Sequence, residues 1–379
     1  MEFFTAERII FERGAVTRLG ELAKAYGKRG CYLHGRQEDQ IQSIRKILLE
    51  NGLEICDFQI HGEPTIVDVK ELVNKCKAYK VDFVISVGGG SVIDTGKTIS
   101  MMLTNPGDLE DYLEVVGQAL PIKFRSAPFI AVPTTAGTGS EVTKNAVLSV
   151  PEKKIKVSLR GSLILARIAL IDPELTLSLP KETTASTGMD ALTQLIEPFL
   201  SIKANPMVDM FCRDGIARVI RSLSSAYKNG GDIYAREDMC WASLYGGIAL
   251  ANAGLGAVHG FAAPIGGMFD APHGAVCAIL LPKVMHVNYK AMKKRGLDTS
   301  KFLELSNIVT GNGQGNMEEC IDIIQSLCED LHIPRLRAYG ITEKDLPIII
   351  GKAKISSSMK GNPLQLDEED LTEILINSL

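Results

Sequence analysis

The chain has 379 residues, enough for two domains, and 45% of them are hydrophobic, which excludes disorder as the main state. Lys and Arg number 41 against 45 Asp and Glu, and the formal net charge of −4 argues against nucleic acid or an anionic membrane surface as the main partner. The chain begins without a signal-peptide pattern and has no unbroken apolar run long enough to span a membrane.

The eight cysteines are spread thinly along the chain and form no CxxC pair. Cysteines spread this thinly do not suit a disulfide scaffold. We therefore expect reduced, mostly buried thiols in a cytoplasmic protein.

Up to about residue 180, short β-branched runs alternate with helical ones. Strands are predicted at 30–33, 53–59, 81–87 and 128–132, and helices at 40–50, 66–79 and 91–103. Such alternation indicates an α/β domain with a parallel sheet and helices on both faces.

Beyond Pro180 the pattern becomes helical throughout, with helices expected at 185–200, 207–227 and 236–253. The sequence therefore predicts two domains, an α/β domain at 1–180 and a helical domain at 181–379.

A glycine turn follows the apolar strand 81–87. It consists of Gly88, Gly89 and Gly90 with Ser91, and it opens the helix that carries Asp94. A helix N-terminus offers free N–H groups and partial positive charge, and glycines let a phosphate approach the backbone. The same residues also suit a turn that only caps a helix.

A second loop, 133–141, follows the strand 128–132 and offers the hydroxyls of Thr134, Thr135 and Thr138. Two such loops at one edge of a parallel sheet favour one ligand crevice.

A second set of residues indicates a metal. Asp190, Gln194 and Glu197 have helical spacing and share one face, while His259 and His273 each stand beside glycine in apolar surroundings. One carboxylate and two imidazoles suit Zn²⁺ or Fe²⁺ with positions left open for substrate. Each histidine taken alone suits a packed or hydrogen-bonded core residue better than a metal ligand.

In these motifs the chain resembles the iron-containing (group III) alcohol dehydrogenase family over nearly its whole length. The motifs are Gly88-Gly89-Gly90-Ser91 with Asp94 and Lys97, residues 133–138, Asp172-Pro173-Glu174-Leu175, residues 188–192, residues 257–260 and Pro272-His273-Gly274. The resemblance implies a Rossmann-like dinucleotide domain and an all-helical metal domain, with metal and nicotinamide in the cleft between them.

The resemblance also implies roles for particular residues. The glycine turn and Ser91 would hold the pyrophosphate, the three threonines would line the cofactor site, and Lys156 would lie near the ribose. Gly35, Arg36, Gly88, Asp94 and Leu175 complete the expected cofactor set. Asp190, His259 and His273 would be catalytic as metal ligands, with Gln194 at the position of a fourth.

The chain departs from the family at three places. Gln194 stands where the family usually has His, and an amide oxygen is a weaker ligand. Ala263 stands where a second His is frequent, so a proton relay is missing or replaced. After the first predicted strand, Gly35 and Arg36 stand where members that prefer NAD tend to carry Asp, which favours NADP or the use of both cofactors.

The predicted reaction is hydride transfer between nicotinamide C4 and a metal-bound alcohol or carbonyl. Three alternatives stay open at this point. They are a metal-independent reductase of the maleylacetate reductase type, a dehydroquinate-synthase-like lyase using Lys97, Lys144 and Lys156, and a nucleotide sensor without catalysis.

The sequence does not identify the substrate beyond a small alcohol or aldehyde. Four residues near the two histidines are candidate pocket walls, and ordinary core positions as well: Phe261, Met268, Phe269 and Cys277. By resemblance we expect a homodimer or a larger homo-oligomer.

Overall fold

The computed structural model describes residues 2–379, which form two compact units. The first comprises the described residues up to Thr135 together with Gly139–Leu177. The second comprises Ser178–Leu379 and the short segment Ala136–Thr138. The division after Leu177 lies close to the expected boundary at 180, but the expectation did not separate residues 136–138 from their neighbours.

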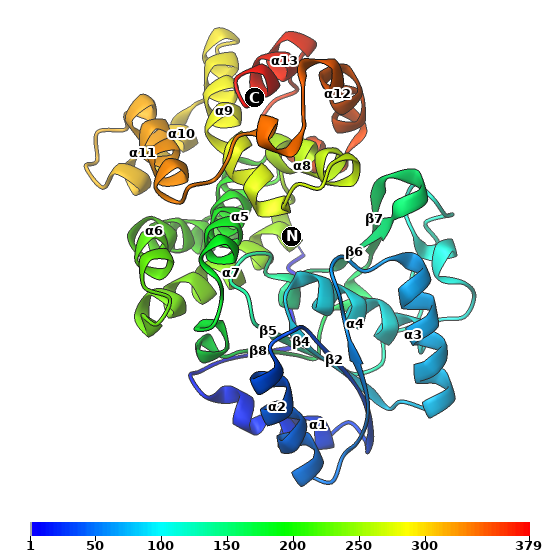
Figure 1. The fold of residues 1–379 in the computed structure, drawn as a ribbon. Helices are drawn as coiled ribbons and strands as arrows, with labels where there is room; N and C mark the ends of the chain where they lie inside the picture. The colour runs from blue at the N-terminus through cyan, green and yellow to red at the C-terminus, as the bar shows by residue number, and fades with distance from the viewer. Residues whose placement is uncertain (1) are drawn as a thin grey trace. The chain divides into compact units, whose positions relative to one another are not determined.

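The first unit contains the expected parallel sheet, which has six strands in the order β1-β8-β5-β4-β2-β3 (Figure 1). The strands are β1 (Arg8–Phe11), β2 (Arg29–His34), β3 (Glu54–Gln59), β4 (Phe83–Gly88), β5 (Phe129–Pro133) and β8 (Ile168–Ile171). Every pairing is parallel. The Rossmann-like fold is confirmed. Four of these strands were expected, whereas β1 and β8 were not.

Helices cover both faces of this sheet, as Figure 1 shows. They are α1 (Leu19–Lys24), α2 (Glu38–Glu50), α3 (Ile66–Tyr79) and α4 (Gly90–Met102). On one face Tyr32, Ile85 and Val132 pack into a core with Leu19 and Ile44 of the first two helices. Alternate strand residues point to the other face, where α3 and α4 lie.

A separate antiparallel hairpin, β6 (Asn145–Val150) and β7 (Ile155–Arg160), follows the loop after β5. It was not predicted. Buried and half-buried positions alternate along the six residues of β6, so only one face of the strand is fully buried. The apolar pattern that would indicate a strand in the sequence is therefore weak.

The strand order places the predicted loops together. From β2 the chain proceeds to β3 on one side, and from β4 to β5 on the other, so the winding reverses between β2 and β4. Ligands of doubly wound sheets bind beyond the carboxyl ends of the strands at such a reversal. Gly35 follows β2, the glycine turn ends β4, and Thr134 follows β5.

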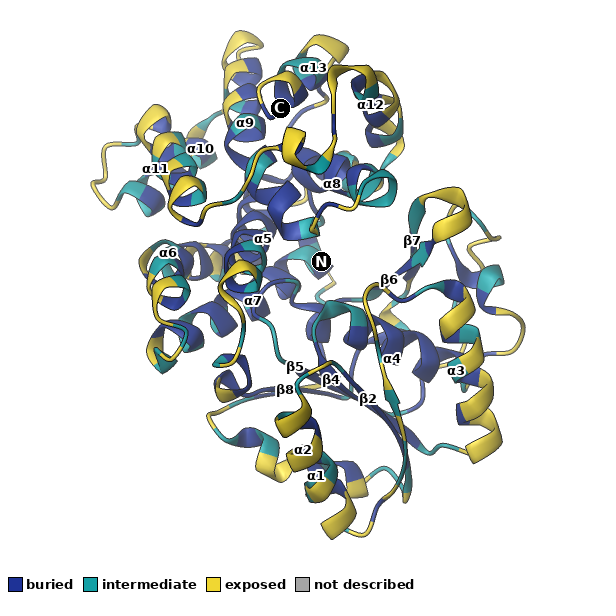
Figure 2. Ribbon diagram, in the orientation of Figure 1, coloured by how far each residue is buried: buried dark blue, intermediate teal, exposed yellow. Residues whose placement is uncertain are grey.

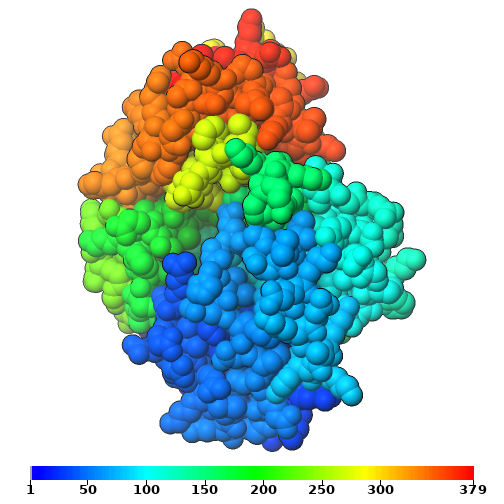
Figure 3. Space-filling model, turned by 45° about the vertical axis from the view of Figure 1, so that its right-hand side comes forward, coloured from blue at the N-terminus to red at the C-terminus, as the bar shows by residue number. Residues whose placement is uncertain are grey.

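The second unit is helical, as expected. Its helices are α5 (Lys181–Leu200), α6 (Pro206–Lys228), α7 (Ile233–Ala253), α8 (Ala257–Met268), α9 (His273–Lys294), α10 (Ser300–Thr310), α11 (Met317–Asp330), α12 (Leu346–Ile355) and α13 (Glu368–Ile376). The central helix is α5, which packs against α6, α7 and α9 and is buried without interruption from Gly188 to Leu200 (Figure 2). The orange-to-red helices α12 and α13 lie at the surface of this unit (Figure 3).

Within residues 2–379, no single helix is long and apolar enough to cross a membrane. Among these residues only α7 and α8 taken together are long and apolar enough for a membrane span, and a bend of 101° separates them. All eight cysteines are free, six of them buried, in agreement with the expectation of reduced thiols.

Candidate active site

The glycine turn and its neighbours lie together at the carboxyl edge of the sheet. Gly88 ends β4, Gly89 precedes α4, and Ser91 lies in the first turn of that 13-residue helix. The backbone N–H of Thr134 donates to the Gly88 carbonyl (3.0 Å), and the N–H of Gly35 donates to the Val87 carbonyl (3.2 Å). Free N–H groups at this helix N-terminus therefore face the edge where a pyrophosphate is expected.

Asp94 and Lys97 form a buried network that sequence reasoning did not predict. The Asp94 carboxylate accepts from the backbone N–H of Val147 (2.9 Å) and from the Ser140 hydroxyl. The Lys97 ammonium, fully buried, donates to the Asn145 carbonyl (2.7 Å). These bonds hold the loop after β5 against α4. Contact of Asp94 with a cofactor stays a prediction.

The other expected cofactor residues have varied surroundings. Arg36 is exposed, and Lys156 on β7 forms an ion pair with Glu63. Leu175 is buried, and its carbonyl accepts from the Gln40 amide (3.1 Å). Thr138 belongs to the second unit. Their cofactor contacts stay predictions.

The structure brings the predicted metal ligands together in the helical unit. Asp190 lies on α5, His259 in the first turn of α8, and His273 at the start of α9. Cys277, one turn along α9, completes the cluster. One ligand atom from each of the four residues lies within 4.8 Å of the others. Asp190, His259 and Cys277 are buried, and His273 is partly exposed.

The distances within the cluster are short. Oδ1 of Asp190 lies 3.4 Å from Nε2 of His259 and 3.6 Å from Nε2 of His273. Sγ of Cys277 lies 3.9 Å and 3.7 Å from the same two nitrogens. Among the described residues, Oδ1 of Asp190 has no hydrogen-bond partner although it is buried. A buried carboxylate oxygen without a hydrogen donor suits a bound cation.

Close packing of α9 on α5 makes this arrangement possible. A Cβ on Gly274 would lie 2.0 Å from the Ser186 carbonyl oxygen and 3.3 Å from Cβ of Asp190. Only glycine therefore allows the start of α9 to approach α5 this closely. The glycine next to His273, noted in the sequence, has this physical role.

Glu197 orients His259. Its Oε2 lies 2.6 Å from Nδ1 of the imidazole, and its Oε1 accepts from the backbone N–H of Val258 (2.7 Å). Because Glu197 binds Nδ1, Nε2 is directed at the cluster, as in carboxylate–histidine–metal arrangements. Helical spacing had placed Glu197 on the face of Asp190 without assigning it this role.

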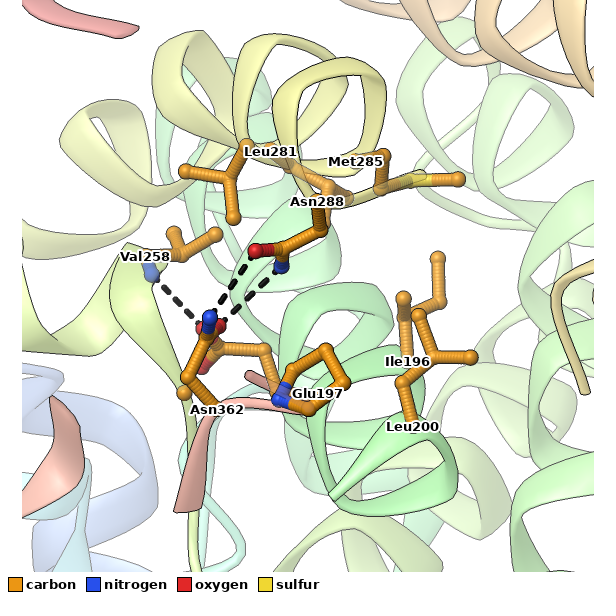
Figure 4. Close-up of a pocket in the computed structure, with 11 residues that line it drawn as sticks. Ile196, Glu197, Leu200, Val258, Leu281, Met285, Asn288 and Asn362 are labelled. Carbon is orange, nitrogen blue, oxygen red and sulfur yellow. Dashed lines mark hydrogen bonds between the residues drawn. The ribbon is translucent and has the colours of Figure 1, made fainter. Parts of the chain in front are cut away.

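A reciprocal pair of amides supports the start of α8 beside Glu197. Asn288 and Asn362 exchange hydrogen bonds of 3.0 and 2.8 Å (Figure 4). Oδ1 of Asn362 also accepts from the backbone N–H of Ala257. Glu197 and the two asparagines line a cavity of about 10 Å³, room for one water at most. The first turn of α8, which carries His259, is thus fixed from two sides.

The electrostatics of the cluster favour a cation. Burial opposes ionisation of Asp190, but the nearby His259 and His273 bring the pKa of its carboxyl below the ordinary value. Burial likewise opposes charge on His259, yet Cys277, Glu197 and Asp190 raise its pKa well above the ordinary value. Burial raises the pKa of the Cys277 thiol to about 12. The opposite shifts of Asp190 and His259 follow from the close approach of the acid and the imidazole, which stabilise each other's charged form.

The amide group of Gln194 faces the backbone of Gly137. Its Nε2 donates to the Gly137 carbonyl (3.0 Å) and lies 3.4 Å from Oδ2 of Asp190. A role of Gln194 as a metal ligand stays a prediction.

The candidate pocket walls have different surroundings: Phe261 is fully buried, Met268 and Phe269 are half-buried, and Cys277 belongs to the ligand cluster. The signal that could have distinguished Cys277 from the other three is its spacing of four residues from His273, which places both side chains on one helix face.

A glycine turn at the reversal point of a parallel sheet and a buried acid–imidazole cluster on helices define a class, the dinucleotide-linked oxidoreductases that use a metal. Family models agree. "Iron-containing alcohol dehydrogenase" matches residues 6–173, and "Fe-containing alcohol dehydrogenase family, C-terminal" matches residues 184–379. The chain belongs to the iron-containing alcohol dehydrogenase family.

Individual relatives support this assignment. Alcohol dehydrogenase 4 of Saccharomyces cerevisiae (strain YJM789) is 36% identical over 337 residues, covering 88% of this chain and 85% of the relative. The NAD-dependent methanol dehydrogenase of Bacillus methanolicus is 31% identical over 392 residues, covering 100% and 99%. The structure of an alcohol dehydrogenase from Oenococcus oeni superimposes with a TM-score of 0.92 at 31% identity, covering all of both chains. The chain is thus an alcohol dehydrogenase, a nicotinamide-linked oxidoreductase with a divalent metal.

Proposed function

We propose that the chain interconverts a small alcohol and its carbonyl form, with Asp190, His259 and His273 as the catalytic metal ligands and the carboxyl edge of the sheet as the dinucleotide site. The main support is the cluster of ligand atoms that lie within 4.8 Å of one another. In this cluster the buried Oδ1 of Asp190 has no hydrogen-bond partner among the described residues. A divalent ion held there would supply Lewis-acid polarisation of the substrate oxygen.

The chain's own residues perform the remaining tasks. Asp190 would supply negative charge to balance a bound ion, and Glu197 fixes the ring of His259 through Nδ1. Burial of Asp190, His259 and Cys277 keeps water from one side of the cluster, while the partly exposed His273 marks the accessible side. The proposed pyrophosphate ligands are the glycine turn and Ser91, with Thr134, Thr135 and Thr138 lining the cofactor site.

The test replaces His259 or His273 with alanine and measures bound metal and turnover. We expect both to fall by at least about 100-fold, since each imidazole would be a direct ligand. His286→Ala is the matched control, because His286 is an exposed histidine on the same helix as His273. Full metal binding and activity in either site variant would refute the proposal. A metal-free protein with full activity would favour the metal-independent reductase instead.

We propose further that the enzyme accepts NADPH at least as well as NADH. The support is Gly35 after β2, where an acid would repel a 2′-phosphate, with the exposed Arg36 beside it. A Cβ on Gly35 would meet nothing within 4 Å, so a side chain fits there without strain.

Gly35→Asp tests this cofactor preference. We expect the ratio of kcat/KM for NADPH to that for NADH to fall by at least about 10-fold, through charge repulsion of roughly 1–2 kcal/mol. Gly35→Ala is the control for added bulk without charge. An unchanged ratio in Gly35→Asp would place the ribose phosphate elsewhere.

Two finer proposals concern the setting of the enzyme. We propose a homodimer or larger homo-oligomer, which light scattering on the purified protein tests. A cytoplasmic location is supported by eight free cysteines, which suit a reducing compartment, and cell fractionation tests it. A screen of alcohols and aldehydes with both cofactors would define the substrate.

A further inference from the structure

The ligand cluster contains a sulfur that the resemblance did not lead us to expect. The fourth position was expected at residue 194, but the Nε2 of Gln194 is committed to the Gly137 carbonyl at 3.0 Å. A carbonyl oxygen can only accept, so this bond fixes which end of the amide faces Gly137. A weak ligand at 194 leaves the site short of a strong fourth donor.

Cys277 offers the cluster another donor, its sulfur, within 4.8 Å of the ligand atoms of Asp190, His259 and His273. It lies four residues after His273, so both side chains lie on one face of α9. Its Sγ lies 3.7 Å from Nε2 of His273 and 3.9 Å from Nε2 of His259, and its side chain is fully buried. Oδ1 of Asp190, which has no hydrogen-bond partner within residues 2–379, belongs to the same cluster, an independent sign that something other than a hydrogen donor binds there.

The spacing agrees with one four-coordinate ion. With metal–sulfur bonds of about 2.3 Å and metal–nitrogen or metal–oxygen bonds of about 2.0–2.1 Å, tetrahedral angles require S···N separations of about 3.6 Å and N···O separations of about 3.4 Å. The observed S···N distances are 3.7 and 3.9 Å, and the N···O distances are 3.4 and 3.6 Å. Each pair is within about 0.3 Å of the tetrahedral value.

We infer that Cys277 is a direct ligand of the ion, as a thiolate that replaces the imidazole missing at position 194. This inference rests on the proposed function and adds a donor to the same site. On binding, the S–H bond of Cys277 breaks, the sulfur–metal bond forms, and the proton passes to bulk water. A donor set of one oxygen, two nitrogens and one sulfur favours Zn²⁺ over Fe²⁺, because thiolate is a soft ligand and the Irving–Williams order places zinc above iron. A fifth position stays available to substrate by expansion of the coordination shell.

Cobalt substitution tests the sulfur ligand independently of activity. The full-length protein loaded with Co²⁺ is expected to show a thiolate-to-metal charge-transfer band in the near ultraviolet, and the Zn²⁺ form a sulfur scatterer at about 2.3 Å in X-ray absorption. Cys277→Ala should lose both signals and bind Zn²⁺ about 10- to 100-fold more weakly. Cys277→Ser, with far-ultraviolet circular dichroism, checks that the loss is not unfolding.

A control variant is needed because a second thiol cluster lies in the α/β unit. Cys31 on β2, Cys56 on β3 and Cys76 on α3 bring their sulfurs within 4.8 Å of one another. Cys56→Ser should leave the charge-transfer band unchanged. A band that disappears in Cys56→Ser and persists in Cys277→Ala would overturn the inference.

A rescue experiment separates this inference from the proposed function. In the double variant Cys277→Ala with Gln194→His, we expect Zn²⁺ affinity to recover at least about 10-fold without return of the sulfur signal, because an imidazole restores a strong donor. Wild-type protein that binds metal through His259 and His273 but lacks the sulfur signal would overturn the inference and leave the proposed function standing. Wild-type protein that binds no metal would overturn both.

Discussion

Replacing Glu197 with glutamine tests how the helical unit holds His259. Glu197 is buried, and its two oxygens accept from Nδ1 of His259 (2.6 Å) and from the N–H of Val258 (2.7 Å). Glutamine has the same shape but only one acceptor, so one of these two donors must face its amide group. The variant loses a charge-assisted hydrogen bond of about 1.5–3 kcal/mol and the lock on the imidazole ring.

The expected result is a metal dissociation constant raised about 10- to 100-fold, which corresponds to about 1.4–2.7 kcal/mol. Competition against a chelator measures this affinity, and the nitrogen chemical shifts of His259 report which ring nitrogen carries the proton. Glu182→Gln is the matched control, since Glu182 is an exposed glutamate on the same helix. An affinity within about threefold of wild type, with the tautomer unchanged, would refute the orienting role.

Two further predictions concern stability. Gly274→Ala should lower the free energy of unfolding in urea by about 2–4 kcal/mol, because its Cβ would lie 2.0 Å from the Ser186 carbonyl oxygen. Gly351→Ala, whose Cβ would meet nothing within 4 Å, should be neutral or stabilising. Equal effects of the two substitutions would contradict the close approach of α9 to α5. Burial raises the pKa of Glu141 to about 7, so the folded state holds a proton that the unfolded state releases near pH 4.5, and stability should fall as pH rises from about 4.5 to 7. Glu141→Gln should flatten that slope and gain about 1–3 kcal/mol at pH 8, and an unchanged pH profile of urea unfolding would show that Glu141 is not the source.

Much of the fold could be predicted because its signals are local. The run 81–87 is apolar and β-branched and became β4, and the periodic pattern at 66–79 became α3. β1 and β8 have only four residues each, too short for a distinctive pattern. Their place in the sheet depends on pairing across some 160 residues, which one sequence does not display.

The candidate site was predictable only in part. Asp190, His259 and His273 could be predicted because carboxylates and imidazoles are common metal ligands, and the structure brings the three side chains together. Cys277 was expected only as a possible pocket wall, because it lies near the two histidines in the sequence. Its sulfur joins the cluster through the contact of α9 with α5, which depends on tertiary packing.

The segment Ala136–Thr138 has a consequence for dissecting this molecule. The chain leaves the α/β unit for three residues, anchors in the helical unit through Gly137 and Gln194, and then returns to finish the sheet. Neither half can therefore be cut out as one continuous fragment. A truncation after Leu177 would separate Gly137 from Gln194 and remove the hydrogen bond between them.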